Sequence, residues 1–292
     1  MNNLTTRPVV LDIDHSVGPL PGRLVLPLEH WQESIRFGCS LPIMRRFRQM
    51  LDELLPAQYG TVFMGSGDFH HLSWPLIARL QPHSPFQVVV LDNHPDNMRF
   101  PFGVHCGSWV RKVAMLPQVE HVHVLGITSA DIGGGHAWEN YLAPLWRKKL
   151  TYWSMGVDTG WSRRLGLGHA FKGFDTPDAL VDAFVEQQRE HALASYLSID
   201  KDAFAPEVAH TNWDQGRLLR GHARALIDSL RHRLIGSDIN GEVSHYAYHS
   251  WWKRQLSAMD EQPAVDPAEL AGWQAQHHAL NLELLEAIAA KS

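Results

Sequence analysis

Acidic and imidazole side chains recur at a spacing of two residues in two segments of the sequence. The segment DNHPD contains Asp92, His94 and Asp96, and the segment DKD contains Asp200 and Asp202. In an extended chain alternate side chains point to one face, so each segment presents its polar groups together. Carboxylates combined with imidazoles bind divalent transition metals in proteins. The two segments therefore predict metal chemistry.

Two further segments add polar groups of the same kind. A glycine turn at residues 65–71 ends in His70 and His71, and either histidine could serve as a metal ligand. Asp238 lies at the end of an apolar run and brings another carboxylate. Asp68, in the glycine turn, fits equally a role behind a ligand histidine and a role as a helix cap.

Each of these segments comes at the end of an apolar run that reads as a β-strand, and helix-length segments separate the runs. The alternation predicts βαβ units, and nearly all-apolar strands fit a sheet covered by helices on both faces. We expect an α/β fold with a mostly parallel central sheet, in one domain over residues 1–292, with a long surface loop at 158–176. The expected strands are 9–13, 61–64, 87–91, 119–125, 151–155, 195–199 and 234–239, and the expected helices are 42–55, 72–80, 108–116, 177–193, 214–230 and 266–290.

The position of the polar segments after strands predicts that they converge. Ligands of open parallel sheets bind beyond the carboxyl ends of the strands. At least four carboxylates and two imidazoles in one cleft would be strongly destabilising without positive charge. Two divalent cations supply that charge, and the donor set suits Mn²⁺, with Fe²⁺, Co²⁺ and Zn²⁺ less favoured. Two metals about 3.5–4 Å apart can share a hydroxide, which is a nucleophile available at neutral pH. We therefore expect two Mn²⁺ per chain.

The composition excludes several classes of protein. The formal net charge of the 292 residues is −5 and no basic block is present, so a nucleic-acid partner is not expected. No apolar run approaches 18 residues, so we expect no membrane span, and the first residues do not resemble a secretory signal. The two cysteines, Cys39 and Cys106, are too few for a disulfide framework and indicate a cytoplasmic protein.

The order of the motifs resembles the arginase/agmatinase (ureohydrolase) superfamily. That family carries a GGDHS-like turn, a DAHxD motif and an SxDxDxxDP motif, which correspond here to SGDFHH (66–71), DNHPD (92–96) and SIDKD (198–202). The resemblance implies an arginase-like three-layer α/β/α fold. It also implies a hydrolase of linear amidines that cleaves a C–N bond of a guanidino or amidino substrate and releases urea or a related amide.

The resemblance implies a role for each matching residue. Two aspartates would bridge both metals, and one histidine and one aspartate would complete each metal's ligands. The bridging residues are then Asp92 and Asp200, with His70 and Asp96 at one metal and His94 and Asp202 at the other. His105, in GVHCG, matches the family's proton-shuttle histidine, Asp238 the acid that holds the guanidinium, and Asp131 a residue that holds a substrate amine.

Departures from the family's motifs lie around the expected pocket. Phe69 stands where an ungapped turn would place the ligand histidine, and the final Asp-Pro of the third motif is replaced by residues 203–206. We therefore expect a retained metal centre with a rebuilt pocket, for a small guanidino compound or a peptide-borne arginine. The family often forms homo-oligomers. Two alternatives stay open: a deacetylase-like amide hydrolase, suggested by the paired histidines, and a metal-binding relative without turnover.

Overall fold

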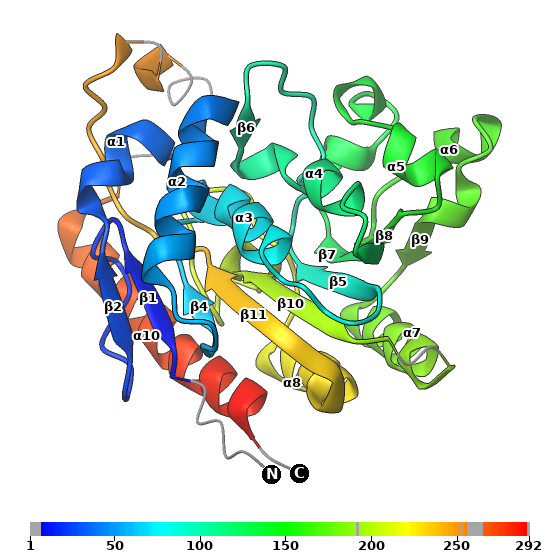
Figure 1. Ribbon diagram of the computed structural model, residues 1–292. Helices are drawn as coiled ribbons and strands as arrows, with labels where there is room; N and C mark the ends of the chain where they lie inside the picture. Colours follow the sequence, from blue (N-terminus) through cyan, green and yellow to red (C-terminus); the bar gives the residue numbers. More distant parts are fainter. Residues whose placement is uncertain (1–6, 191–192, 252, 256–264, 291–292) are drawn as a thin grey trace.

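The fold of this chain is built on a nine-stranded sheet in which every pair of neighbouring strands is parallel (Figure 1). It is known from a computed structural model that describes residues 7–190, 193–251, 253–255 and 265–290. The strand order is β2-β1-β4-β11-β10-β5-β7-β8-β9, and β3 and β6 form a separate antiparallel pair. The strands are β1 (Val9–Asp12), β2 (Leu24–Pro27), β3 (Gly38–Cys39), β4 (Val62–Phe63), β5 (Phe86–Leu91), β6 (Val104–His105), β7 (Val119–Ile127), β8 (Leu150–Met155), β9 (Phe171–Phe174), β10 (Ser195–Asp200) and β11 (Leu234–Asn240).

Helices cover both faces of the sheet, which confirms the expected α/β fold with three layers (Figure 1). On one face lie α2, α3 and α4, and on the other lie α7, α8 and α10. The helices are α1 (Gln32–Ile35), α2 (Leu41–Leu54), α3 (Ser73–Ala78), α4 (Val110–Ala114), α5 (Ala143–Trp146), α6 (Trp161–Arg164), α7 (Pro177–Glu190), α8 (Arg220–Leu230) and α10 (Pro267–Ala289).

Alternate residues of the central strands feed two separate apolar cores. In β5, Val88 and Val90 join the core under α2, α3 and α4, whereas Val89 and Leu91 join the core under α7, α8 and α10. The period of two along a strand sends successive side chains to opposite faces, so a strand covered on both faces must be apolar throughout. This explains why β5 is buried at every position.

Helix boundaries follow local capping signals. Asp266 precedes α10, and its carboxylate accepts a hydrogen bond from the backbone N–H of Ala268 at 2.7 Å. Pro267 occupies the first helical position, where no backbone N–H is required. The expected helix at 266–290 is thus confirmed within one residue at each end.

Two expectations about elements are wrong. The stretch 158–176, expected as a surface loop, contains α6 and the edge strand β9, whose four residues are too short and too exposed to show an apolar run. Helix α8 begins at Arg220 rather than at residue 214. The preceding segment is held as a loop by Gln215, which accepts a hydrogen bond from the backbone of Thr211 at 2.9 Å and donates one to the backbone of Ala209 at 2.6 Å.

Strand register brings the carboxyl ends of the middle strands to one level. Ile199 of β10 pairs with Leu91 of β5, so Asp200 and Asp92 emerge side by side. Among the helices of the described ranges, none is both long and apolar enough to cross a membrane.

Candidate metal centre

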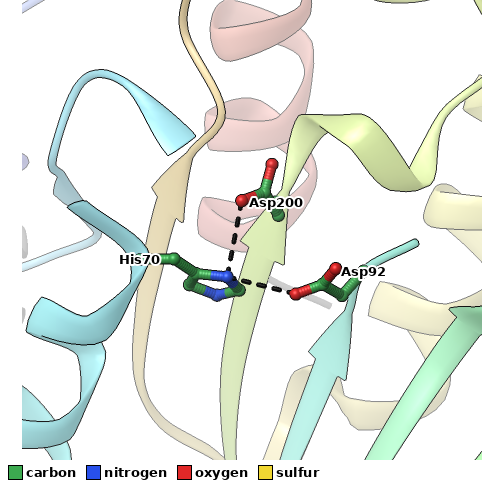
Figure 2. Close-up of side chains that lie close together, drawn as sticks. All are labelled: His70, Asp92 and Asp200. Carbon is green, nitrogen blue, oxygen red and sulfur yellow. Dashed lines mark ion pairs between the residues drawn. The ribbon is translucent and has the colours of Figure 1, made fainter. Parts of the chain in front are cut away.

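Three segments far apart in sequence meet at the carboxyl ends of β5 and β10 (Figure 2). His70, on the 3-10 helix η2 (Gly67–Leu72), points its ring between two carboxylates. Its Nδ1 lies 3.1 Å from Asp92 Oδ2 and 3.4 Å from Asp200 Oδ2. All three side chains are buried. The convergence expected from the sequence is therefore what the fold produces.

Asp96 returns to this cluster through an unusual backbone conformation. Its φ is 46°, in the left-handed region that residues other than glycine seldom adopt. The turn brings Asp96 Oδ2 to 2.9 Å from His70 Nδ1. One imidazole nitrogen thus faces three carboxylates.

A second group of ligand-type side chains adjoins the first. His94 Nδ1 lies 3.0 Å from Asp202 Oδ2 and 3.6 Å from Asp92 Oδ1. Candidate ligand atoms of His70, Asp92 and Asp200 lie within 4.8 Å of one another, and so do those of Asp92, His94 and Asp202. The two triads share Asp92, each of whose two oxygens faces one of them. A carboxylate shared in this way is the arrangement that two adjacent cations require.

The electrostatics of the cluster fit bound cations. Burial lowers the pKa of His70, but its hydrogen bonds to Asp92 and Asp96 outweigh burial and raise that pKa well above its ordinary value. Burial, reinforced by the neighbouring charge of Asp202, raises the pKa of Asp200 well above its ordinary value. The cluster thus favours added positive charge. Apart from His70 Nδ1 at 3.1 Å, the described residues give the buried Oδ2 of Asp92 no hydrogen-bond partner, which leaves a lone pair for a metal.

The structure distinguishes the two consecutive histidines. His70 faces the carboxylates, whereas the structure places no carboxylate in hydrogen-bond contact with the buried ring of His71. Burial lowers the pKa of His71 well below its ordinary value, so this ring is neutral. The geometry therefore favours His70 as the candidate ligand.

Asp238 lies behind His70 and not at an open surface. Ser198 connects the two: its hydroxyl is 3.0 Å from His70 Nε2 and donates to Asp238 Oδ1 at 2.7 Å. Tyr196 donates to Asp238 Oδ2 at 2.7 Å, and Ser73 donates to Oδ1 at 3.1 Å. Asp238 is fully buried. With both oxygens occupied by hydroxyl donors, Asp238 has the contacts of a residue that orients His70, which corrects the expected direct hold on the substrate.

His105 lies in an aromatic enclosure beside the centre. Its ring stacks on Phe37 at 5.8 Å between centroids and meets the edge of Phe100 at 4.5 Å. Its Nδ1 accepts a hydrogen bond from the backbone N–H of Gly107 at 3.0 Å. Burial lowers its pKa to about 4. The neutral ring then carries its proton on Nε2.

Asp131 lies on a short 3-10 turn after β7, at the same edge of the sheet as the other segments. It is half-buried, and its Oδ2 accepts a hydrogen bond from Ser129 at 3.0 Å. Its role stays a prediction.

Three groups of residues near the centre have contacts that the sequence did not predict. Asp68 neither supports a ligand histidine nor caps a helix with its side chain: its carboxylate accepts a 2.7 Å hydrogen bond from buried Arg36. Lys201, between the two aspartates of the third motif, is buried against Glu242 at 2.5 Å. The third group is a pair of tryptophans, Trp109 and Trp213, whose indole N–H groups donate to Asp96 and Asp202. Local sequence patterns carry no signal for such contacts, because each partner comes from a distant segment.

Comparison with known proteins supports the fold. No family model matches the chain. An uncharacterized protein of Thermotoga maritima is 26% identical over 211 residues, which are 71% of this chain and 67% of that protein. The structure resembles proclavaminate amidino hydrolase from Streptomyces clavuligerus, with a TM-score of 0.55, 16% identity, and coverage of 98% of this chain and 93% of that one.

A second solved structure points the same way. It is formiminoglutamase of Trypanosoma cruzi with Mn²⁺, which has a TM-score of 0.52 and 12% identity over 86% of this chain and 72% of that one. Identities this low establish the architecture and not the activity. The resemblance to the arginase/agmatinase (ureohydrolase) superfamily is thus confirmed at the level of the fold, and this chain has an arginase-like structure.

Proposed function

We propose that the chain, as a single domain, is a binuclear metal hydrolase of the ureohydrolase type. It cleaves a C–N bond of a guanidino or amidino substrate and releases urea or a related amide. The observation that carries this proposal is the pair of triads that share Asp92. Two solved structures of similar fold, an amidino hydrolase and a formiminoglutamase, support the substrate class.

Six residues would hold two divalent cations, for which Mn²⁺ is the proposed metal. When bound, the cations supply Lewis acidity and a water-derived nucleophile at neutral pH. The carboxylate and imidazole donors suit Mn²⁺, and the formiminoglutamase of similar fold was solved with it. In the proposal Asp92 and Asp200 are shared by both cations, and the other ligands are His70, Asp96, His94 and Asp202.

His105 is proposed as the residue that faces the departing nitrogen. The sequence predicted a proton shuttle, which requires a charged ring at some stage. The hydrogen bond from Gly107 to Nδ1 and the burial of the ring oppose that charge. We therefore assign to His105 the role of a neutral Nε2–H donor that orients the leaving group and stabilises charge on it.

Substrate selection is proposed to involve Asp131, which would bind an amine of the substrate through its carboxylate. Since Asp238 is buried behind His70, the planar cation needs another partner, so the pocket differs from the one expected by resemblance. We propose a small guanidino compound or a peptide-borne arginine as substrate. Cys39 and Cys106 form no disulfide with each other, in keeping with the proposed cytoplasmic location.

The deacetylase-like alternative loses its main support. It depended on two consecutive histidines acting together, but only the ring of His70 enters the carboxylate cluster. Only an activity assay can distinguish an enzyme from the other alternative, a metal-binding relative without turnover.

A substrate panel tests the proposal. Manganese-loaded protein is incubated with arginine, agmatine, guanidinobutyrate, formiminoglutamate and an arginine-containing peptide, and urea and formamide are measured. We expect release from at least one compound, lost in the Asp92→Asn variant and kept in the exposed control Asp52→Asn. Acetate release from an acetylated amine, with no urea or formamide, would support the deacetylase instead. No product from any compound by metal-loaded protein would support the relative without turnover.

A further inference from the structure

Two tryptophans donate their indole N–H groups to the outer carboxylates of the candidate metal centre. Trp109 Nε1 donates to Asp96 Oδ2 at 2.6 Å, and Trp213 Nε1 donates to Asp202 Oδ2 at 3.0 Å. In each case the bonded oxygen is the one that faces a histidine of the centre, His70 for Asp96 and His94 for Asp202. The indoles thus contact Oδ2 of each carboxylate, which is the oxygen that would hold a cation, and not Oδ1.

Trp109 is fully built into the protein interior. It lies at the start of α4, is completely buried, and its ring centroid is 4.7 Å from that of His70. An indole N–H is a donor only, so it neither titrates in the physiological range nor competes for the metal. A buried histidine or asparagine at this place would offer a rival ligand atom.

Trp213 reaches Asp202 from the loop that precedes α8. The loop crosses η2 at Gly67, where a Cβ atom would lie 2.9 Å from the Trp213 ring and 3.5 Å from Asp200 Oδ2. A glycine is thus needed for the close approach. The other oxygen of Asp202 accepts a hydrogen bond from the backbone N–H of Asn93 at 3.0 Å. Both oxygens of Asp202 are therefore held by neutral N–H donors.

We propose that Trp109 and Trp213 are positioning residues that fix Asp96 and Asp202 for metal binding. A carboxylate oxygen has two lone pairs, and the indole occupies one of them while leaving the other toward the cation. The fixed carboxylates bind more tightly because less orientation is lost when the metal arrives. This inference rests on the metal-binding part of the proposed function.

Replacement by phenylalanine removes the N–H group and keeps an aromatic ring. Mn²⁺ binding to wild-type protein and to the Trp109→Phe and Trp213→Phe variants is measured by calorimetry. Loss of a supporting hydrogen bond typically weakens metal binding about 10–100-fold, and we expect that loss in each variant. Trp138→Phe, at a largely exposed position outside the centre, is the control and should bind as wild type does.

Fluorescence checks that the two indoles lie beside the bound cation. Mn²⁺ is paramagnetic and quenches an indole in direct contact with its ligands, so saturation should lower the emission of wild-type protein and of Trp138→Phe. In the double variant Trp109→Phe/Trp213→Phe, saturated at higher Mn²⁺, that quenching should be largely lost. Since Trp109 is fully buried and its replacement can unfold the chain, the half-buried Trp213 decides the test on its own.

The outcomes distinguish the two levels of the proposal. If wild-type protein binds no Mn²⁺, the proposed function fails. If wild-type protein binds Mn²⁺ and Trp213→Phe binds it within twofold of wild type, the positioning role is overturned and the proposed function stands.

Discussion

Among the single residues of the centre, Asp92 is distinguished by two carboxylate oxygens that face different triads. Asp92 Oδ2 faces His70 at 3.1 Å, and Asp92 Oδ1 faces His94 at 3.6 Å. A group with two anionic oxygens on opposite triads can bind two cations at once. A carboxamide has one acceptor oxygen and no charge, so it cannot do the same.

Replacing Asp92 by Asn should therefore abolish binding at both sites together. We expect fewer than half a Mn²⁺ per chain after dialysis in Asp92→Asn, measured by elemental analysis, with the folded structure kept. Asp52→Asn, at an exposed position, should bind as wild type does. Two bound ions in the Asp92 variant would show that this carboxylate is not shared.

The pH dependence of the reaction tests the role of His105. Burial lowers its pKa to about 4, so the ring is neutral throughout the range above about pH 5 and gains no proton near 6.5. His105→Ala should lower kcat about 10²–10³-fold, the loss typical of one hydrogen-bond donor, while the shape of the pH profile between 5 and 8 stays unchanged. A limb with a midpoint near 6.5 that is present in wild-type protein and absent in the variant would restore the proton shuttle.

Among the elements, a buried ion pair links the SIDKD segment (198–202) to the C-terminal helix α10. Lys201, between Asp200 and Asp202, donates to Glu242 at 2.5 Å, and Glu242 Oε2 lies 3.1 Å from the ring of His277 on α10. All these side chains are buried. The pair thus holds the loop that carries two candidate ligands against both β11 and α10.

Removing the charge of Glu242 should destabilise the fold, because Lys201 would remain as a buried unpaired cation. We expect Glu242→Gln to lower the free energy of unfolding of metal-free protein by about 3–5 kcal/mol at pH 7, measured with urea. Glu186→Gln, at an exposed position, should change it by less than about 0.5 kcal/mol.

The same pair predicts how stability changes with pH. Burial raises the pKa of Glu242, but the charge of Lys201 and the contact with His277 outweigh burial and lower it from 4.5 to about 2. A lowered folded-state pKa adds stability above the unfolded value, and this stability is lost as the pH falls through the folded value. The advantage of wild-type protein over Glu242→Gln should therefore shrink between about pH 4.5 and 2. An advantage that is constant across this range would contradict the assignment.

At the scale of the whole molecule, the sequence could predict which segments meet but not what each side chain contacts. The apolar runs before Asp92 and Asp200 predicted neighbouring parallel strands, and polar groups after such strands share one edge of a sheet. Asp238 was misjudged because its partners Tyr196 and Ser198 lie on the adjacent strand, and only the register of β10 with β11 brings them opposite. Edge strand β9 could not be predicted, because its four partly exposed residues show no apolar run.

Electron paramagnetic resonance of Mn²⁺-loaded protein shows whether one pocket holds two cations that share Asp92. Two Mn²⁺ ions that share a carboxylate are close enough for their spins to couple. We expect a coupled spectrum that grows until two ions are bound per chain and that is absent from Asp92→Asn. An uncoupled spectrum that saturates at one ion per chain, or no bound manganese, would contradict this expectation.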